Sequence, residues 1–296
     1  MRRRDFLYAL SASGFMNFVN VRGAMPSNPK ADEMKRRLEE MRAKALAAFP
    51  FEVIKTPGNM VLKEWEGLKS AGRGVPIVIG DDEALARLTE PFSEQWLEKR
   101  NVAEVLSIAD GLRHPESLAA HRNAEKARAL ETLRQGFDAK LLGGKSFEEV
   151  VKELDVGPEV GSWPADAPSA PGLSVVMDFR TGAPVEAAHI VLIPTDDWTT
   201  IPAHLRWGGW NSCPPSEYHV AALRSWRDRY GVELVGMNFD TLNLRAKSAP
   251  RTRDEALALA REQHAYCGDI VDQGVGTFSA LAAALMSDHW WYFWWD

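Results

Sequence analysis

The chain ends in its most apolar stretch. The last nine residues, DHWWYFWWD from Asp288 to Asp296, contain four tryptophans, a tyrosine and a phenylalanine. Side chains alternate in an extended chain, so Trp290, Tyr292 and Trp294 would share one face and the intervening aromatic residues the other. A strand that is apolar on both faces is typical of the inside of a sheet. We therefore predict a buried strand inside a sheet; the alternative, an exposed docking patch, would leave an aromatic edge open to aggregation.

The overall composition is that of a folded globular protein. Of 296 residues, 45% are hydrophobic and 26% are charged, and the formal net charge is −6. An acidic chain lacks the basic surface that binding to a phosphate backbone requires, so we expect no nucleic-acid partner. No apolar run reaches the roughly 20 residues that span a bilayer, so we expect no integral membrane segment.

The first residues predict an export signal. MRRRDFLYAL has three arginines directly after Met1 and continues into a moderately apolar stretch, as in twin-arginine signals. We interpret residues 1–26 as this signal, which would place the mature protein in the periplasm or outside the cell. A cytoplasmic protein with a basic N-terminal segment is the alternative. Cys213 and Cys267 are too few to indicate a compartment.

Residues 27–155 are predicted to form a helix-rich α/β region. Hydrophobic periodicity, β-branched runs and breakers predict helices at 27–48, 60–71 and 115–154 and strands at 51–56 and 75–80. Gly143 and Gly144 interrupt the third helical stretch. Asp81, Asp82 and Glu83 are interpreted as helix-capping acids rather than catalysts.

A second domain is predicted after a linker. Residues 156–174 are rich in proline, glycine and serine, which is typical of a linker. The remaining residues, 175–296, show the order β-β-α-β-β-α-α-β, with strands near 173–179, 188–194, 232–237, 241–247 and the C-terminal end and helices at 215–230, 252–267 and 277–286. Thr252 and Thr277 are the expected caps. Paired strands between helices predict an α+β fold: a mixed or antiparallel sheet with helices on one face.

Three stretches of the C-terminal region resemble a known family. They are WGGWNSCPPSEYHVAALRSWRDRYGVELVGM, TRDEALALAREQHAYCGDIVDQGVGT and the WWYFWWD ending. Together they resemble domain of unknown function 4253, a family of bacterial proteins, from about Ala188 to Asp296. The resemblance implies no activity. The chain departs from the family pattern at His264, where tyrosine is usual, and at Gly268, where proline is usual.

Cysteine and histidine residues suggest two kinds of chemistry. Cys213 precedes a predicted helix, whose free N–H groups would lower the thiol pKa, but His219 lies off the same helical face, so a nucleophilic pair requires the loop to fold back. With His264 and Cys267 these residues could supply four zinc ligands. The spacing is weak, and His264 departs from the family pattern, so we expect no metal and no cofactor. A Cys213–Cys267 disulfide after export, or simple burial of Cys213, are the other interpretations.

Two loops carry the remaining candidate residues. In RWGGWNSCPP, Trp207, Trp210 and Asn211 surround a glycine pair and could bind a ligand. In CGDIVDQGVGT, the polar side chains Asp269, Asp272 and Gln273 lie between two helices, where the alternative is helix capping and turn formation. If the two loops meet, these six residues would form an aromatic-walled pocket.

Three functions are compatible with these features. We expect a non-enzymatic protein that binds a ligand or another protein, because no catalytic pattern stands out. The alternative is a hydrolase-like or transferase-like enzyme, with Asp269 or Asp272 as general base and Cys213 as a candidate nucleophile. The third is an immunity-like protein that neutralises a toxin, for which the acidic charge is the only indication.

Overall fold

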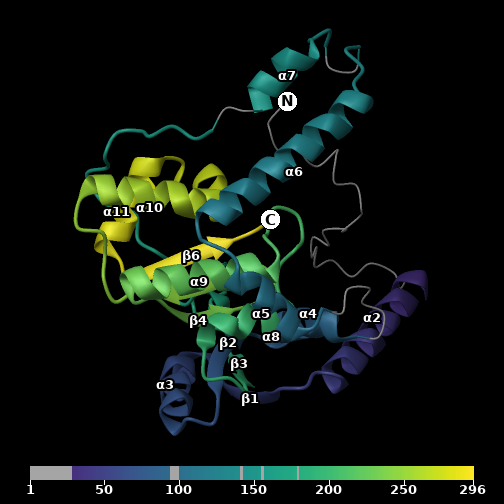
Figure 1. The fold of residues 1–296 in the computed structure, drawn as a ribbon. Helices are drawn as coiled ribbons and strands as arrows, with labels where there is room; N and C mark the ends of the chain where they lie inside the picture. The colour runs from purple at the N-terminus through teal and green to yellow at the C-terminus, as the bar shows by residue number, and fades with distance from the viewer. Residues whose placement is uncertain (1–28, 94–99, 141–142, 155–156, 179) are drawn as a thin grey trace. The chain divides into compact units, whose positions relative to one another are not determined.

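The computed structural model describes residues 29–93, 100–140, 143–154, 157–178 and 180–296 (Figure 1). The predicted export signal at 1–26 lies outside the described residues. Within them, no helix combines the length and apolar character needed to cross a membrane.

The described strands form one mixed sheet. Its six strands lie in the order β1-β3-β2-β4-β5-β6. β2 and β4 are parallel, and the other neighbouring pairs are antiparallel. Together with the helices, this confirms the predicted α+β fold with a mixed sheet. The bounds are β1 (Glu52–Pro57), β2 (Val75–Gly80), β3 (Ala187–Ile193), β4 (Glu233–Met237), β5 (Thr241–Arg245) and β6 (Trp290–Trp294).

The sheet crosses the domain boundary predicted at residues 156–174. β1 and β2 come from the N-terminal region, yet β2 pairs with β3 on one side and β4 on the other. All but the first residue of β2 are buried, as expected for a central strand with both faces of the sheet covered. The compact unit that holds the sheet therefore comprises residues 42–127 and 158–296, and a second unit comprises residues 1–41 and 128–157.

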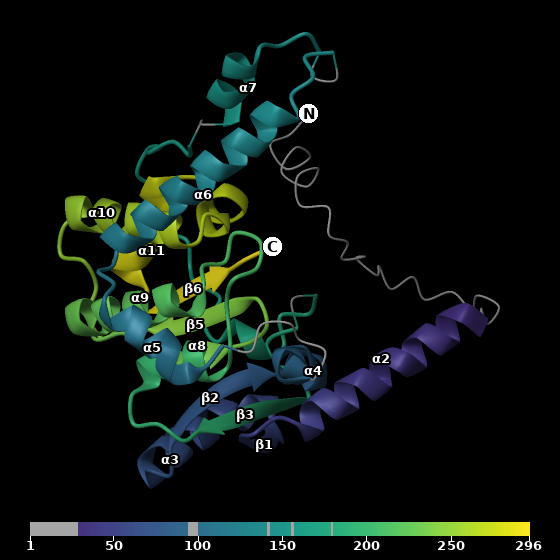
Figure 2. The ribbon, with the colours of Figure 1, turned by 45° about the vertical axis from the view of Figure 1, so that its right-hand side comes forward.

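Helices cover both faces of the sheet in the larger unit (Figure 2). The C-terminal helices α9, α10 and α11 share one core with the β6 rings, as predicted for that domain, whereas α3 packs on the other face through Val61, Trp65 and Leu68. The helices of this unit are α3 (Val61–Ala71), α4 (Asp82–Thr89), α5 (Val102–Asp110), the first part of α6 (Glu116–Gln135), α8 (Ile201–His204), α9 (Ser216–Tyr230), α10 (Arg253–Tyr266) and α11 (Phe278–Ser287).

Side-chain caps begin several of these helices. The side chains of Asp81, Thr252 and Thr277 accept hydrogen bonds from the backbone N–H groups of Ala84, Glu255 and Ala280. Each bond satisfies one of the free donors of a first turn, which confirms all three as caps. Shorter turns complete the unit: the 3-10 helices η1 (Gly58–Met60), η2 (Glu90–Phe92), η3 (Ser174–Val176) and η4 (Trp198–Thr200), and the π-helix η5 (Ile270–Val275).

The strand predicted at 173–179 does not form over its described residues. η3 occupies its centre, and Met177 forms only an isolated bridge with Pro184. The buried Asn243 of β5 explains the turn: its Oδ1 accepts from the Val175 backbone N–H, and its Nδ2 donates to Ser174 Oγ. The β-branched run predicted a strand, but this tertiary contact favours a turn.

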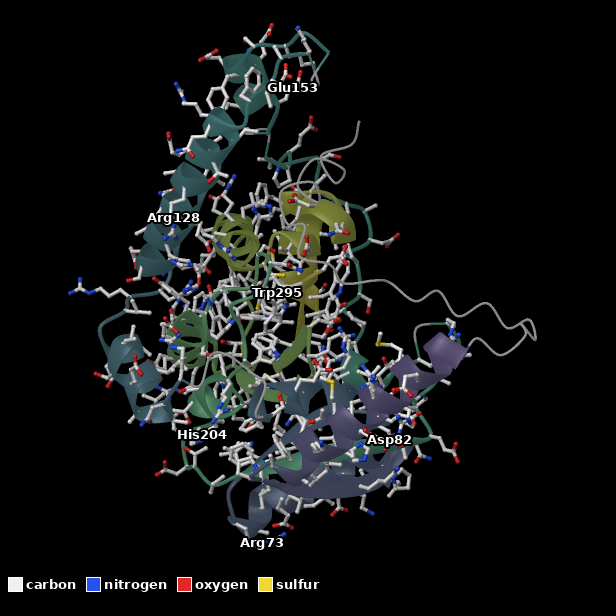
Figure 3. All side chains as sticks on the ribbon, turned by 90° about the vertical axis from the view of Figure 1, so that its right-hand side faces the viewer. Arg73, Asp82, Arg128, Glu153, His204 and Trp295 are labelled. Atoms are coloured by element: carbon white, nitrogen blue, oxygen red, sulfur yellow. The ribbon has the colours of Figure 1, made fainter. Side chains whose placement is uncertain are left out.

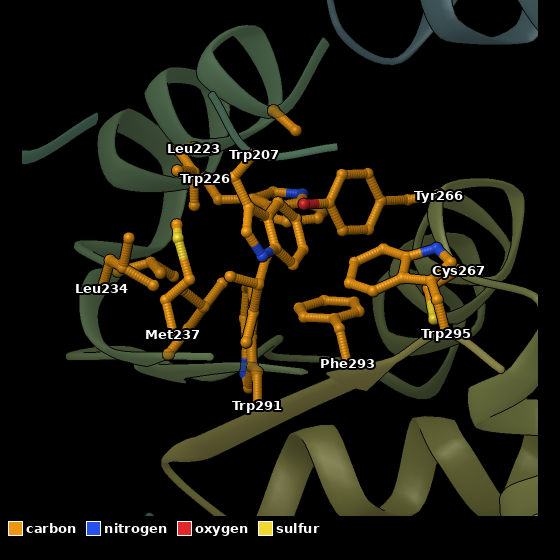
Figure 4. Close-up of a cluster of buried hydrophobic side chains, with 14 of the residues drawn as sticks. Trp207, Leu223, Trp226, Leu234, Met237, Tyr266, Cys267, Trp291, Phe293 and Trp295 are labelled. Carbon is orange, nitrogen blue, oxygen red and sulfur yellow. The ribbon is translucent and has the colours of Figure 1, made fainter. Parts of the chain in front are cut away.

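The aromatic C-terminal stretch forms β6, which is an edge strand and not an inner one. β6 pairs with β5 alone. The predicted alternation is present: Trp291, Phe293 and Trp295 are 2%, 0% and 1% exposed, and the rings between them are half-buried. Figure 4 shows the three buried rings beside Trp226 and Tyr266. One face of β6 therefore completes the main core. The rings of the other face stay half-buried, which is compatible with a position at the edge of the sheet.

The second unit contains the N-terminal part of α2 (Pro29–Ala47), the end of α6 and α7 (Phe147–Leu154). Gly143 and Gly144 both have positive φ, as expected for the predicted break between the last two. The rings of Phe137 and Phe147 meet edge to face, with centroids 5.6 Å apart.

Candidate functional site

The two candidate loops lie at one edge of the sheet. Because β2, β4 and β6 run in the same direction, their C-terminal ends lie at this edge. The turn 238–240 joins the loops to the sheet there. Trp207 Nε1 donates to the carbonyl oxygen of Asn238 (2.6 Å), and the Trp295 backbone N–H donates to the carbonyl oxygen of Asp240 (3.1 Å). The C-terminal edge of strands is a common position for sites in sheets with parallel pairs.

Both loops bind the backbone of Asp296. Asn211 Nδ2 donates to the backbone oxygen of Asp296 (2.8 Å), and the Asp296 N–H donates to Asp269 Oδ2 (3.1 Å). Gln273 Nε2 donates to the other oxygen of Asp269 (2.8 Å). These three bonds form a continuous chain from one loop to the other. The structure thus brings Asn211, Asp269 and Gln273 together, and Asp296 is the link between them.

The second loop is a π-helix and not an open turn. η5 follows Asp269 and ends at Val275, and the next residue, Gly276, has φ of +82°. Asp272, exposed on η5, lies with Oδ1 3.3 Å from Nε2 of His264 on α10. π-Helical turns are rare and occur frequently at functional sites.

The first loop has an unusual backbone. Arg206 and Asn211 have φ of +53° and +45°, and Gly208 and Gly209 between them have +104° and +88°. Non-glycine residues with positive φ are uncommon and often lie at functional positions. The loop turns back on itself because the Gly209 N–H donates to the Pro214 carbonyl oxygen (2.9 Å).

Beneath this loop lies a buried chain of three polar side chains. Cys213 Sγ is 3.4 Å from His219 Nε2, and His219 Nδ1 is 2.5 Å from the hydroxyl oxygen of Tyr266. The imidazole ring packs edge to face with Trp207 (4.7 Å between centroids) and Trp295 (5.6 Å). The loop does fold back to pair Cys213 with His219. We call Cys213, His219 and Tyr266 the buried triad.

Burial sets the protonation of the triad. Cys213 is 3% exposed, and His219 and Tyr266 are 0% exposed. Burial raises the pKa of the Cys213 thiol and of the Tyr266 hydroxyl well above their usual values, and it lowers the pKa of His219 to about 3. All three groups are therefore neutral at neutral pH. The expectation of a lowered thiol pKa is wrong, because Cys213 lies outside α9, which begins at Ser216, and because burial dominates.

The four residues considered for zinc lie in different hydrogen bonds. Cys213 and His219 contact each other, His264 contacts Asp272, and the Cys267 thiol donates to the Trp294 carbonyl oxygen (2.9 Å). Among the described residues, no three His, Cys, Asp or Glu side chains form a group that could hold a metal ion. Cys213 and Cys267 are both buried and free, without the disulfide that export could produce.

The tryptophans of the first loop belong to the core. Trp207 is 3% exposed and packs edge to face against Trp295 and the half-buried Trp210. A ligand could reach Trp207 only if the loop moved. Figure 3 shows Trp295, the floor of this region, among the densely packed side chains of the larger unit. The exposed part of the site is therefore polar: Asn211, Asp272 and Gln273.

Three residues of the site, Tyr266, Asp240 and Asp296, are not among the candidates that the sequence pattern indicates. Burial raises the pKa of Asp240, and nearby Asp296 adds to this rise. Thr241 Oγ1 donates to the Asp240 carboxylate (2.8 Å). Asp240 follows β4 in a tight turn, and its position at the C-terminal end of that strand was the one available signal. Tyr266 lies in a helix whose pattern does not distinguish it from a core residue.

The neutral His219 makes a testable contribution to the pH dependence of stability. Its pKa falls from 6.5 to about 3 on folding, so between these values the unfolded chain binds a proton that the folded chain does not. Stability must then decrease as the pH falls, by about 2 kcal/mol from this group between pH 7 and pH 5. Urea unfolding at both pH values should show that the free energy of unfolding of the unaltered protein decreases from pH 7 to pH 5. In His219→Gln this decrease should be smaller by the amount that His219 contributes. Equal losses would show that His219 does not carry the effect.

The fold and the site define an α+β protein with one mixed sheet and a polar site at the C-terminal edge of its strands. Residues 189–296 match the family model described as Domain of unknown function (DUF4253), which confirms the resemblance seen in the C-terminal part of the chain. The match includes both loops, the buried triad and Asp296. No curated protein and no solved structure matches the chain.

Proposed function

We propose that this protein is a non-enzymatic binding protein whose contact surface is the exposed part of the two loops. One observation carries the proposal: the hydrogen bonds Asn211–Asp296–Asp269 join the loops into a single fixed surface. Loops held by a rigid scaffold are frequent binding elements, because their polar groups keep a defined geometry. The strained backbone of the first loop and the π-helix of the second support the same assignment.

The exposed side chains favour a polar ligand or partner that donates hydrogen bonds. Asp272 and Gln273 are exposed on η5, and Asn211 is exposed on the other loop. Asp240 and Asp296 add carboxylates at the same edge. We assign Asp269 a positioning role and not that of a general base, because both of its oxygens accept hydrogen bonds from groups that hold the loops together.

Site-specific photo-crosslinking tests this surface. A benzoyl-phenylalanine at Gln273 should give one dominant adduct, identified by mass spectrometry, after irradiation of cells producing the full chain. Lys63, exposed on α3 in the same unit, is the control position. We expect the Gln273 adduct to fall about tenfold with Asp269→Ala, which releases the fixed loop geometry. The same adduct at Lys63, or an adduct unaffected by Asp269→Ala, would contradict the proposal.

A second candidate function rests on the buried triad. The triad reproduces the order of nucleophile, base and orienting group. These are a thiol, an imidazole 3.4 Å away and a hydroxyl group that orients the imidazole. This enzyme would need the loop 206–214 to open, because burial keeps the thiol protonated and out of reach.

Alkylation of the native protein separates the two functions, and Cys267 provides an internal control because it is equally buried. For a binding protein, iodoacetamide should modify neither cysteine until denaturant is added. For an enzyme with an opening loop, Cys213 should react in native protein well before Cys267, and His219→Gln should remove this difference.

A further inference from the structure

An arginine of α6 joins the first loop to the helix that carries Tyr266. Arg122 donates from Nη2 to the carbonyl oxygens of Ser212 (2.5 Å) and Tyr266 (3.2 Å), and from Nε to the carbonyl oxygen of Ala265 (3.3 Å). Its Nη1 donates to Glu125 Oε2 on the next turn of α6 (3.1 Å). All five residues belong to the larger unit. Arg122 therefore connects α6, the last turn of α10 and the first loop.

The chemistry of these contacts favours an arginine. The last carbonyl groups of a helix have no partner within the helix and carry its partial negative charge, so a cation at Ala265 and Tyr266 is stabilising. A planar guanidinium has five N–H donors in a fixed arrangement and can bind several carbonyl oxygens at once. A lysine ammonium on its flexible chain does not reproduce this arrangement. The Ser212 carbonyl thus binds a cation that α10 already holds in place.

The tip of the first loop is held from two directions. Asn211 Nδ2 donates to the backbone oxygen of Asp296 (2.8 Å), and the carbonyl oxygen of the next residue, Ser212, accepts from Arg122. Ser212 directly precedes Cys213 in the chain. Arg122 therefore fixes the backbone beside the buried thiol, whereas Asn211 fixes the side of the loop that faces the second loop.

The guanidinium group also acts on the buried triad. Burial is the main reason that the pKa values of the Cys213 thiol and the Tyr266 hydroxyl are raised, and the positive charge of Arg122 opposes this rise in both. Burial is likewise the main reason that the pKa of His219 is lowered, and the same charge contributes to the decrease. Because such effects decrease with distance, Arg122 must lie near the triad as well as at the loop.

We propose that Arg122 is a positioning residue that latches the first loop closed over the buried triad. Opening of the loop requires the bond from Arg122 to the Ser212 carbonyl to break, while the bonds from Arg122 to α10 can remain. The inference rests on the proposed function, because the latched loop carries Asn211 of the contact surface. The latch would keep that surface in its fixed geometry and would keep Cys213 out of reach of solvent.

Alkylation of the native full-length protein measures how often the loop opens. When opening and closing are faster than alkylation, the reaction rate of a buried thiol is proportional to the open population. In Arg122→Gln, iodoacetamide should modify Cys213 at least about tenfold faster than in the unaltered protein. Tenfold corresponds to about 1.4 kcal/mol, which is near the lower end for a hydrogen bond to a charged group. Cys267, which is also buried, should keep its rate.

Two further variants complete the test. Arg224→Gln is the matched control: Arg224 pairs with Asp110 of α5 (2.7 Å), so its loss should change neither cysteine. Arg122→Lys keeps the positive charge beside α10 but not the donor arrangement, so it should also speed up the reaction of Cys213. This second variant decides the question if Arg122→Gln does not fold.

Two results would overturn the latch. One is an unchanged rate for Cys213 in the Arg122 variants. The other is an equal acceleration of Cys213 and Cys267, which would mean that Arg122 stabilises the unit as a whole and does not act on the loop. The crosslink at Gln273 tests the proposed function, and the rate of Cys213 tests the latch, so the failure of one is distinguishable from the failure of the other.

Discussion

Replacing Trp295 by alanine should reduce the free energy of unfolding by about 4 kcal/mol, which is typical for loss of a buried aromatic side chain. Trp295 is 1% exposed, and its ring meets those of Trp207, His219 and Tyr266 at centroid distances of 5.4, 5.6 and 5.3 Å. Its Nε1 has no hydrogen-bond partner among the described residues, so the change removes packing alone. Urea unfolding of the purified protein measures the loss.

The neighbouring Trp294 is the matched control. It is the same residue type one position earlier in the chain, but its side chain is half-buried and points to the other face of the sheet. Trp294→Ala should reduce the free energy of unfolding clearly less, by about 1 to 2 kcal/mol, because the Trp294 side chain buries less apolar surface on folding than Trp295 does. Equal losses for the two variants would show that the two faces of β6 do not differ as described.

Gly208→Ala should be as damaging, with a loss of about 4 kcal/mol from backbone strain and overpacking together. The residue has φ of +104°, and a Cβ there would lie 2.3 Å from the Pro214 carbonyl oxygen and 2.8 Å from two atoms of the His219 ring. Neither neighbour can move freely, since one is backbone and the other is fully buried. The variant should therefore also disturb the contact between Cys213 and His219, which faster alkylation of Cys213 would reveal.

Gly209 distinguishes crowding from backbone strain. Its φ is +88°, yet a Cβ there would meet nothing within 4 Å. Gly209→Ala should then cost only the strain of a left-handed alanine, about 1 to 2 kcal/mol. If Gly209→Ala were as destabilising as Gly208→Ala, the close approach of Gly208 to His219 would not be the cause.

Local sequence patterns predicted most helices and strands of the fold. They could not predict which strands from distant parts of the chain pair with each other. Thr252 and Thr277 could be assigned as caps because a cap depends on residues within one turn. The alternation of the β6 side chains followed in the same way from the period of a strand. That β6 lies at an edge, and that β1 and β2 join the C-terminal strands, depends on contacts between distant parts of the chain.

The candidate site shows the same limit. The two loops could be selected from their glycines and polar residues, but their connection runs through Asp296, whose role depends on where β6 ends. Cys213 and His219 are six residues apart and were expected to diverge on a helix. They meet because Cys213 lies before α9, in a loop whose turn depends on the positive φ of Gly208 and Gly209.

The strand order also determines when the protein can fold. Val78 of the central strand β2 pairs with Ile190 of β3 and with Gly236 of β4, so the middle of the sheet forms from segments that are far apart in the sequence. Such non-local pairing slows folding, because loop closure costs entropy before any contact compensates for it. β6 supplies the rings of Trp291, Phe293 and Trp295 to the main core, so a growing chain leaves Trp226 and Tyr266 without these neighbours until β6 has been synthesised. The main core is therefore expected to close only after β6 has joined the sheet.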